Sequence, residues 1–279
     1  METVTTTIYG SYIQTCQLLN KQPNILQYTT LNEKFNIYKD EVLYDGEIPR
    51  LAYVAIGNGG HKLSTGANGI GFNTPVLHTP RHASLYSHMP FVLRTVDNDL
   101  TAIERDRFRL RKVIDINGVT YVAYYLRVLD LAPISPAMEH KLVENNTIYT
   151  NDFIPAASDL EPTPPNLDPN ATNTTTGEYL ASTAKIPFVM DSNDIIELQN
   201  ACRILYGSDE YAIISEVALC TGIERALDGD FNGTIASYNE AIAVQVSGFI
   251  NTLYSTKYIN DKIDVVFDVG AVEPLQVVG

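Results

Sequence analysis

Four of the five histidines, His61, His78, His82 and His88, lie close together in the sequence. Imidazole side chains grouped in this way can bind zinc or other first-row metals. His78 and His82 would face the same way on a helix, because residues four apart share one face. Pro80 lies between them, however, and proline interrupts a helix. We therefore expect a loop, with His78 and His82 as candidate metal ligands but hydrogen-bonded structural histidines as the simpler interpretation.

Asp228, Asp230 and Asn232 form a second set of candidate metal ligands. With Gly233 they have the spacing that begins a calcium-binding loop. The pattern then fails, because the twelfth position is Asn239 and the acid comes one residue late. The flanking segments also read as strands, whereas the calcium motif needs two helices. A tight glycine-containing turn explains these residues better, so we predict neither a metal nor a cofactor.

Two further patterns that could indicate an enzyme have simpler explanations. The glycine-rich run 57–60 follows an expected strand, but Lys62 stands where a dinucleotide-binding loop needs a third glycine. Asp97 and Asp99 could act as an acid–base pair, yet Asp and Asn commonly bond to their own backbone in turns. Because no serine-nucleophile motif and no neighbouring cysteine–histidine pair accompanies them, we do not expect an enzyme.

Alternate residues from 105 to 111 are arginine, in a chain whose net charge is −14. On a strand, alternate residues share a face, so these four side chains would repel one another unless acids neutralised them. The acids could belong to this chain, to a neighbouring subunit or to nucleic-acid phosphates, which arginine binds through forked hydrogen bonds. We single out these residues as candidates for a charged interface between subunits: Arg105, Arg107, Arg109 and Arg111.

A β-hairpin over residues 105–131 must position this arginine face. Its turn is Asn117–Gly118, the dipeptide that best accepts the two positive φ angles of a two-residue turn. Further strands are expected at 49–57, 210–227, 241–254 and 262–270. Helices are expected near 12–19 and over 194–206, the second capped by Ser192 or Asn193 and ended by Gly207. The predicted fold is mainly β (α+β), an antiparallel β-sandwich or barrel-like core with one or two helices and long loops.

The chain divides by composition into three regions. Residues 1–154 form a β-rich region around the hairpin, and residues 178–279 form an α+β region of the same domain. Between them, residues 155–177 are rich in Pro, Asn and Thr and poor in apolar side chains, so they cannot build a core. We expect this segment, the N-terminal stretch and the loop 57–90 to act as arms that contact neighbours.

The bulk composition limits the classes of partner. There are 19 basic and 33 acidic residues, which disfavours nucleic-acid binding because phosphate affinity comes from clustered Lys and Arg. No apolar run is long enough to span a membrane. Cys16, Cys202 and Cys220 are widely spaced, which argues against a disulfide framework or a zinc site. The first residues do not read as a signal peptide, so we expect a protein made in a cytoplasm.

Three blocks of this sequence resemble virion structural proteins of tailed bacteriophages. They are IPRLAYVAIGNGGHK, the stretch from HTPRHASLYSHMPF through NGVTYVAYYLRVLDL, and the C-terminal INDKIDVVFDVGAVEPL. The resemblance covers about half of the chain and includes no catalytic motif. It implies a protein of the virion, assembled in the host cytoplasm, that joins other virion structural proteins in a ring or wedge of the tail or baseplate without chemistry of its own.

Three alternatives remain open at this point. One is a neck or collar component, or a connector between head and tail. Another is a carbohydrate- or receptor-binding module, because the chain has 17 Tyr and no Trp and many Asn, a composition suited to contacts. The last is a metal-dependent enzyme that uses the four histidines. An exposed platform of aromatic side chains would favour the binding module, and a bound metal would favour the enzyme.

Overall fold

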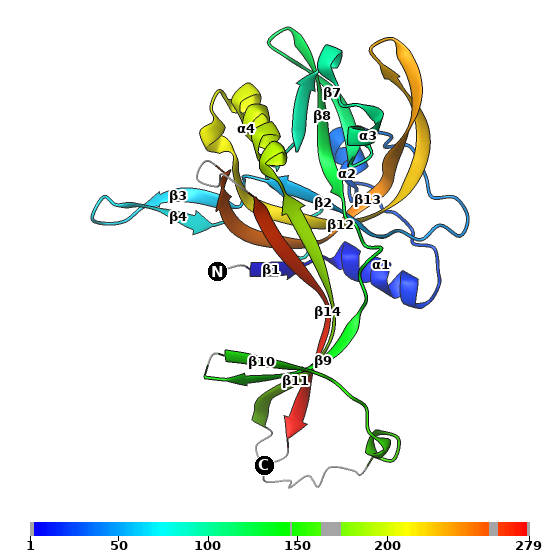
Figure 1. Ribbon diagram of the computed structural model, residues 1–279, viewed down its shortest axis with the longest axis vertical. Coiled ribbons are helices and arrows are strands. Elements are labelled where there is room, and N and C mark those ends of the chain that lie inside the picture. The colour runs from blue at the N-terminus through cyan, green and yellow to red at the C-terminus, as the bar shows by residue number, and fades with distance from the viewer. Residues whose placement is uncertain (1–2, 146, 163–173, 257–261, 278–279) are drawn as a thin grey trace. The chain divides into compact units, whose positions relative to one another are not determined.

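The computed structural model describes residues 3–145, 147–162, 174–256 and 262–277 (Figure 1). The chain is mainly β with antiparallel sheets, which confirms the predicted fold class. Its contacts divide it into two compact units. Unit 1 contains Met1–Leu129 and Met190–Ile263, and unit 2 contains Asp130–Val189 and Asp264–Gly279. These boundaries differ from those expected at 154/155 and 177/178, and residues 163–173 of the expected arm lie outside the described part.

An eight-stranded antiparallel sheet forms the centre of unit 1. Its strands run in the order β1-β13-β12-β2-β8-β6, with β5 paired to β2 and β7 paired to β8. Their bounds are β1 Thr3–Thr6, β2 Arg50–Gly57, β5 His88–Met89, β6 Val92–Thr95, β7 Phe108–Ile116, β8 Val119–Val128, β12 Ile213–Phe231 and β13 Thr234–Ser255. A separate hairpin joins β3, His61–Thr65, to β4, Gly71–Pro75.

Both predicted tight turns of unit 1 are present. Asn117 and Gly118 have φ angles of 51° and 81° and join β7 to β8, which confirms the two-residue turn. Asn232 and Gly233, with φ angles of 54° and 82°, join β12 to β13 in the same manner. β8 lies between other strands, because it pairs with β7 along one edge and with β2 and β6 along the other. Over residues 214–222 every position of β12 is buried, because both faces of a central strand are covered.

The core of unit 1 is built from the inner strands and from helices packed against them. The described helices are α1 Ile8–Leu18, α2 Leu31–Phe35, α3 Ala102–Arg105 and α4 Ser192–Tyr206, with 3₁₀ turns at Val96–Asn98, Ala157–Asp159 and Asp209–Tyr211. α1 lies directly on β13, where a Cβ on Gly10 would come within 2.6 Å of Ser247 Cα. α4 ends at Gly207 as predicted, but its N-cap is Asp191 rather than Ser192 or Asn193. No described helix is long and apolar enough to cross a membrane.

Unit 2 contains a four-stranded sheet in the order β10-β9-β11-β14. Phe188 and Phe267 stack at 5.7 Å between ring centroids in its small core. Glu139 bridges Lys141 and Lys185, at 3.2 and 2.7 Å. β10 is an edge strand, and every one of its residues is exposed. The strands are β9 Ala137–Glu144, β10 Thr147–Asp152, β11 Thr174–Met190 and β14 Ile263–Val277.

Candidate functional site

The four arginines do not form one face of one strand, so that prediction is wrong. Arg105 ends α3, and β7 begins only at Phe108. Within β7, Leu110 has a φ of 52°, which breaks the alternation of side chains. The cause is Glu240, whose carboxylate accepts the backbone amides of Leu110 at 2.5 Å and Arg111 at 3.0 Å. The strand must turn both amides toward this one buried acid.

Acids of the same chain neutralise three of the four arginines. The partner atoms lie 3.0 Å apart for Arg107–Asp194, 2.8 Å for Arg109–Glu224 and 3.2 Å for Arg111–Asp99. The fourth, Arg105, lies over the Phe231 ring at 3.6 Å and donates to the Leu100 carbonyl. The side chains of Arg109 and Arg111 are only 3% and 9% exposed. Of these three arginines, only Arg107, which is 45% exposed, could itself contact a neighbouring subunit.

Of the histidines, the structure brings His78 and His82 together and places His61 and His88 elsewhere. The Nδ1 atoms of His78 and His82 lie 3.3 Å apart. His61 begins β3, and the ring of His88 packs edge-on against Phe35. The described residues contain no group of three or more His, Cys, Asp or Glu that could hold a metal ion. The four histidines therefore do not form the cluster that a metal-dependent enzyme would need.

The calcium-like residues lie at the end of the β12–β13 hairpin. Asp228 and Asp230 belong to β12, and Asn232 begins the turn. Asp230 accepts the Gly233 amide at 2.6 Å, and Asn232 donates to Asp97 at 3.1 Å. Side chains that bond within the hairpin and to the neighbouring loop account for this spacing. The turn interpretation is therefore sufficient for these residues.

A buried carboxylate that the sequence did not single out, Glu216 on β12, organises the loops beside the sheet. It accepts backbone amides from Gly59 at 3.0 Å, Tyr86 at 3.1 Å and Ser87 at 2.9 Å. Its Oε2 atom also lies 2.8 Å from Nε2 of His78, and both side chains are fully buried. Burial alone would raise the pKa of Glu216, but these hydrogen bonds outweigh it and hold the pKa below its usual value.

Both ring nitrogens of His78 have side-chain partners. Nε2 faces the Glu216 carboxylate. Nδ1 faces Nδ1 of His82, which already accepts the Thr79 amide at 3.3 Å and so has no proton there. The ring is also stacked between Tyr86 and Phe249, with centroids 4.3 and 3.8 Å away. Because every side of His78 is occupied, it holds the loops together and is not free to meet a substrate.

This Glu216–His78 cluster fixes the base of the β3–β4 hairpin. Next to it, Gly60 donates to the Ser215 hydroxyl at 2.9 Å, and Val76 donates to the Gly60 carbonyl at 2.7 Å. The side-chain amide of Asn251 on β13 donates a hydrogen bond to the Val76 carbonyl at 2.9 Å. The glycine-rich run is explained by close packing, since a Cβ on Gly60 would lie 2.3 Å from the Ser215 carbonyl oxygen. Both ends of the hairpin are therefore anchored to the central sheet.

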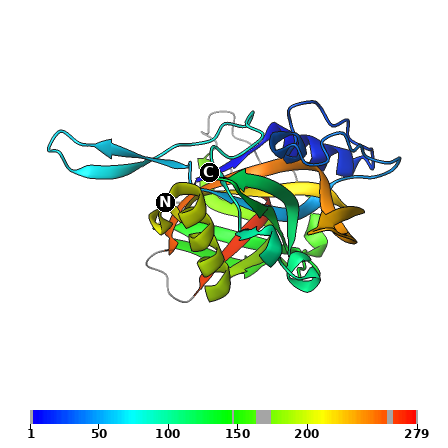
Figure 2. The same cartoon turned by 90° about the horizontal axis from the view of Figure 1, so that it is seen from above.

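The β3–β4 hairpin itself extends away from the rest of unit 1, as both Figure 1 and Figure 2 show. It forms a sheet of only two strands. Leu63, Ile70 and Phe72 on it are 77%, 64% and 52% exposed. An isolated hairpin is marginally stable in water, and large exposed apolar side chains gathered in one place mark contact surfaces. The loop 57–90, expected to be irregular, thus presents an ordered apolar projection.

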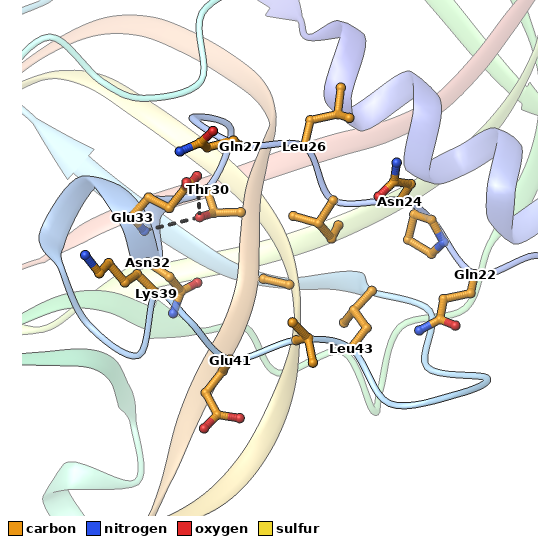
Figure 3. A pocket seen from close by; sticks show the side chains of 14 residues that line it. Gln22, Asn24, Leu26, Gln27, Thr30, Asn32, Glu33, Lys39, Glu41 and Leu43 are labelled. Atoms are coloured by element: carbon orange, nitrogen blue, oxygen red, sulfur yellow. Dashed lines mark hydrogen bonds between the residues drawn. The ribbon is translucent and has the colours of Figure 1, made fainter.

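A cavity of about 360 Å³ lies between the loops 22–27 and 39–43, α2 and Ala243 (Figure 3). Its size suits a small ligand. Its polar side chains, however, hold the surrounding chain in place. Thr30 caps α2 by accepting a hydrogen bond from the Glu33 amide at 3.2 Å. The side chain of Asn32 donates to the Ala241 carbonyl at 2.8 Å and accepts from the Val244 amide at 2.9 Å. Because these side chains already have partners within the chain, the cavity is a weaker candidate for a functional site than the hairpin.

Comparison with known proteins gives one match. A model described as "Family of unknown function (DUF7208)" matches residues 1–278, so the chain belongs to this family. No curated protein and no solved structure matches the chain.

Proposed function

We propose that this protein is a non-enzymatic structural subunit that assembles in several copies in the tail or baseplate of a tailed-bacteriophage virion. The observation that carries the proposal is the β3–β4 hairpin, which is anchored at its base by buried polar contacts and exposes Leu63, Ile70 and Phe72 at its end. A fixed base and an apolar projection suit a part that must meet a partner in one orientation. The resemblance of the sequence blocks to virion proteins is the reason for placing this subunit in a virion that is assembled in the host cytoplasm.

The buried acids support an architectural role for the arginines and histidines. Glu216, Glu240 and Asp194 are each buried and each hydrogen-bonded by amides or cations of the same chain. A buried charge is retained only when it is paired, because desolvation is costly. These groups therefore explain how strands and loops are held in register, and they leave contact with neighbours to the projecting hairpin and to exposed strand edges.

The mass of the purified full-length chain in solution tests the proposal. We expect a species larger than the 30.9 kDa chain, measured by light scattering over a range of concentrations. A variant in which residues 62–74 are replaced by a short Gly-Asn turn should lose mass toward the monomer while keeping its unfolding transition. Ile235→Ser, at an equally exposed position on another hairpin, serves as the matched control. The proposal would be contradicted if the protein stayed monomeric at high concentration and was absent from purified virions.

One observation favours a carbohydrate-binding module as the second candidate. Tyr12 on α1 is 42% exposed, and Tyr28 and Tyr44 in the loops that follow it are 80% and 57% exposed. Sugars stack on such rings. Against this, the Arg225 guanidinium already lies 3.7 Å from the Tyr44 ring centroid, and the Tyr12 hydroxyl accepts the Asn24 amide. A glycan array probed with the intact protein separates the two candidates, since a monomer that binds sugar supports the module.

A further inference from the structure

The loop that carries the β3–β4 hairpin is unusual in charge for this chain. From Gly57 to Val96 there is no Asp or Glu, although the whole chain has 33 of them. The segment carries Lys62, Arg81 and Arg94 instead. Lys62 lies on β3 and is exposed. On the hairpin itself Lys62 is the one Lys, Arg, Asp or Glu, since Arg81 follows the hairpin and Arg94 pairs with Glu197. An acidic surface therefore suits the hairpin best.

Unit 2 provides such a surface. Its two stretches, 130–189 and 264–279, hold eleven acidic residues against only Lys141 and Lys185. Both lysines already pair with Glu139. Two of the exposed acids, Glu144 and Asp152, lie at opposite ends of the β9 and β10 strands. The edge of this sheet is thus acidic, although Lys185 also interacts electrostatically with Asp152.

The same edge is open to strand pairing. β10 is bonded to β9 on one side and ends the sheet on the other. Ile148 and Tyr149 on it are 57% and 52% exposed. An exposed edge strand with apolar side chains is a template for another strand, unless proline or charge blocks it. β10 contains no proline, and its one charged residue is Asp152, at its end.

On the hairpin, β3 fits this template better than β4 does. β4 ends in Pro75, which lacks an amide proton and is typical of a strand edge that does not pair. β3 keeps all five of its amides and carries Lys62 and Leu63. Five residues of β3 match the six of β10 in length. Lys62 can meet an acid at one end of β10 while Leu63 covers Ile148 or Tyr149.

We propose that β3 of one copy pairs edge to edge with β10 of unit 2 in a second copy. The inference rests on the proposed function, because it supplies the contact through which copies would join. The two surfaces are different parts of the chain, so each copy offers both to its neighbours. A contact of this head-to-tail kind closes into a ring or continues as a filament, depending on the rotation between copies.

Mixing two singly substituted full-length proteins tests the pairing between copies. One carries Leu63→Cys and the other Tyr149→Cys; the native cysteines Cys16, Cys202 and Cys220 are buried, so the new thiols react first. With oxidised glutathione as the oxidant, we expect the mixed disulfide dimer to form on the order of 100-fold faster than with Ile235→Cys as the second protein, because contact holds the thiols at an effective concentration near the millimolar range. Equal rates for the two mixtures overturn the proposal.

Charge reversal gives a second readout that does not depend on thiol geometry. Lys62→Glu should weaken association of otherwise unmodified copies, and Asp152→Lys should do the same. Mixing the Lys62→Glu protein with the Asp152→Lys protein should restore association, because the reversed charges match again. Association that is unaffected by both single changes contradicts the pairing.

The outcomes separate this inference from the proposed function. If the wild-type chain is multimeric but the mixed disulfide forms no faster than the control, only the β3–β10 pairing fails. If the chain is monomeric at every concentration and absent from virions, the proposed function fails with it. A third protein carries both Leu63→Cys and Tyr149→Cys. If its disulfide forms only within one chain, the hairpin meets unit 2 of its own chain and the pairing between copies is overturned.

Discussion

Nε2 of His78 lies 2.8 Å from Oε2 of Glu216, and neither side chain is exposed to solvent. This pair joins β12 to the loop that follows β4. Three backbone amides of the surrounding loops donate to the same carboxylate. The acid therefore accepts hydrogen bonds that these amides would otherwise make to water. The placement of the β3–β4 hairpin depends on this one residue more than on any other side chain near its base.

Replacing the charge of Glu216 should therefore destabilise unit 1. Glu216→Gln keeps the shape of the side chain but replaces one acceptor oxygen by an NH2 group. At least one of the groups that now donate to the carboxylate therefore loses its acceptor. A hydrogen bond to a buried charged group contributes about 1.5–3 kcal/mol, so its loss corresponds to a fall in the thermal midpoint on the order of 5–10 °C. Calorimetry measures this fall. Asp45→Asn, which removes a charge from an exposed loop of the same unit, controls for net charge, and an equal effect of both changes would contradict the assignment.

His88 should make the stability of unit 1 depend on pH. Burial lowers the pKa of His88 to about 3, and Lys34 and His78 add to the effect, against the opposing influence of Glu216. The unfolded chain takes up this proton near pH 6.5, so it binds more protons than the folded chain between the two values. Stability is therefore complete above about pH 6.5 and falls as the pH drops toward 3, by up to about 1.4 kcal/mol per unit.

Urea unfolding at several pH values tests this dependence. His88→Gln keeps an oxygen that can accept the Leu85 amide, which Nε2 accepts now at 3.2 Å, but it cannot take up a proton. The variant should show a shallower slope of unfolding free energy against pH between 6.5 and 4. His140→Gln removes an imidazole from unit 2 as the control. A slope unchanged by His88→Gln would show that another group is responsible.

The arginines should differ widely in their effect on stability. Arg109→Ala leaves Glu224 without its cation, and it removes a donor to the carbonyls of Asp106 and Phe108. Because Arg109 is buried and both carbonyls lose this donor, we expect a loss of about 2 kcal/mol or more. Arg107 is 45% exposed, and Asp194 keeps Arg127 at 2.7 Å. Arg107→Ala should therefore cost no more than about 1 kcal/mol. Equal losses in denaturant unfolding would contradict this distinction.

This difference in burial between Arg109 and Arg107 also decides which substitution can test a role in assembly. Arg109→Glu would place a second acid beside Glu224 in a buried position, so its absence from particles would reflect misfolding. Arg107→Glu alters an exposed group and leaves the fold intact. Of the three arginines that pair with acids, only Arg107 can therefore test a role in contacts between subunits.

Local signals in the sequence predict the regular elements of this fold well. Asn117–Gly118 predicts a hairpin because few other dipeptides adopt two positive φ angles, and Gly207 predicts the end of α4 because glycine favours the left-handed C-cap. Such signals depend on a residue and its immediate neighbours. They therefore hold whatever the rest of the chain does.

The buried charges could not be predicted in the same way, because they depend on contacts between distant residues. Glu240 meets Leu110 from 130 positions away, and Glu216 meets His78 from 138. The strict alternation of arginines suggested an exposed face, but the positive φ of Leu110 follows from Glu240 and not from any neighbour in sequence. One signal was available: Glu216 and Glu240 each lie beside a long apolar run of a central strand, where an unpaired acid would be costly.

The exposed apolar side chains of the β3–β4 hairpin should affect assembly without affecting folding. Phe72→Ser and Leu63→Ser change groups that are 52% and 77% exposed in the single chain, so the thermal midpoint should move by little. If a neighbouring copy buries each side chain, its loss should remove about 1.5–3 kcal/mol of association free energy, which weakens the dissociation constant roughly 10- to 100-fold. Sedimentation at several concentrations measures this constant, and Ile235→Ser controls for the loss of an exposed apolar group elsewhere. A dissociation constant that neither Phe72→Ser nor Leu63→Ser alters would show that the hairpin does not join the copies.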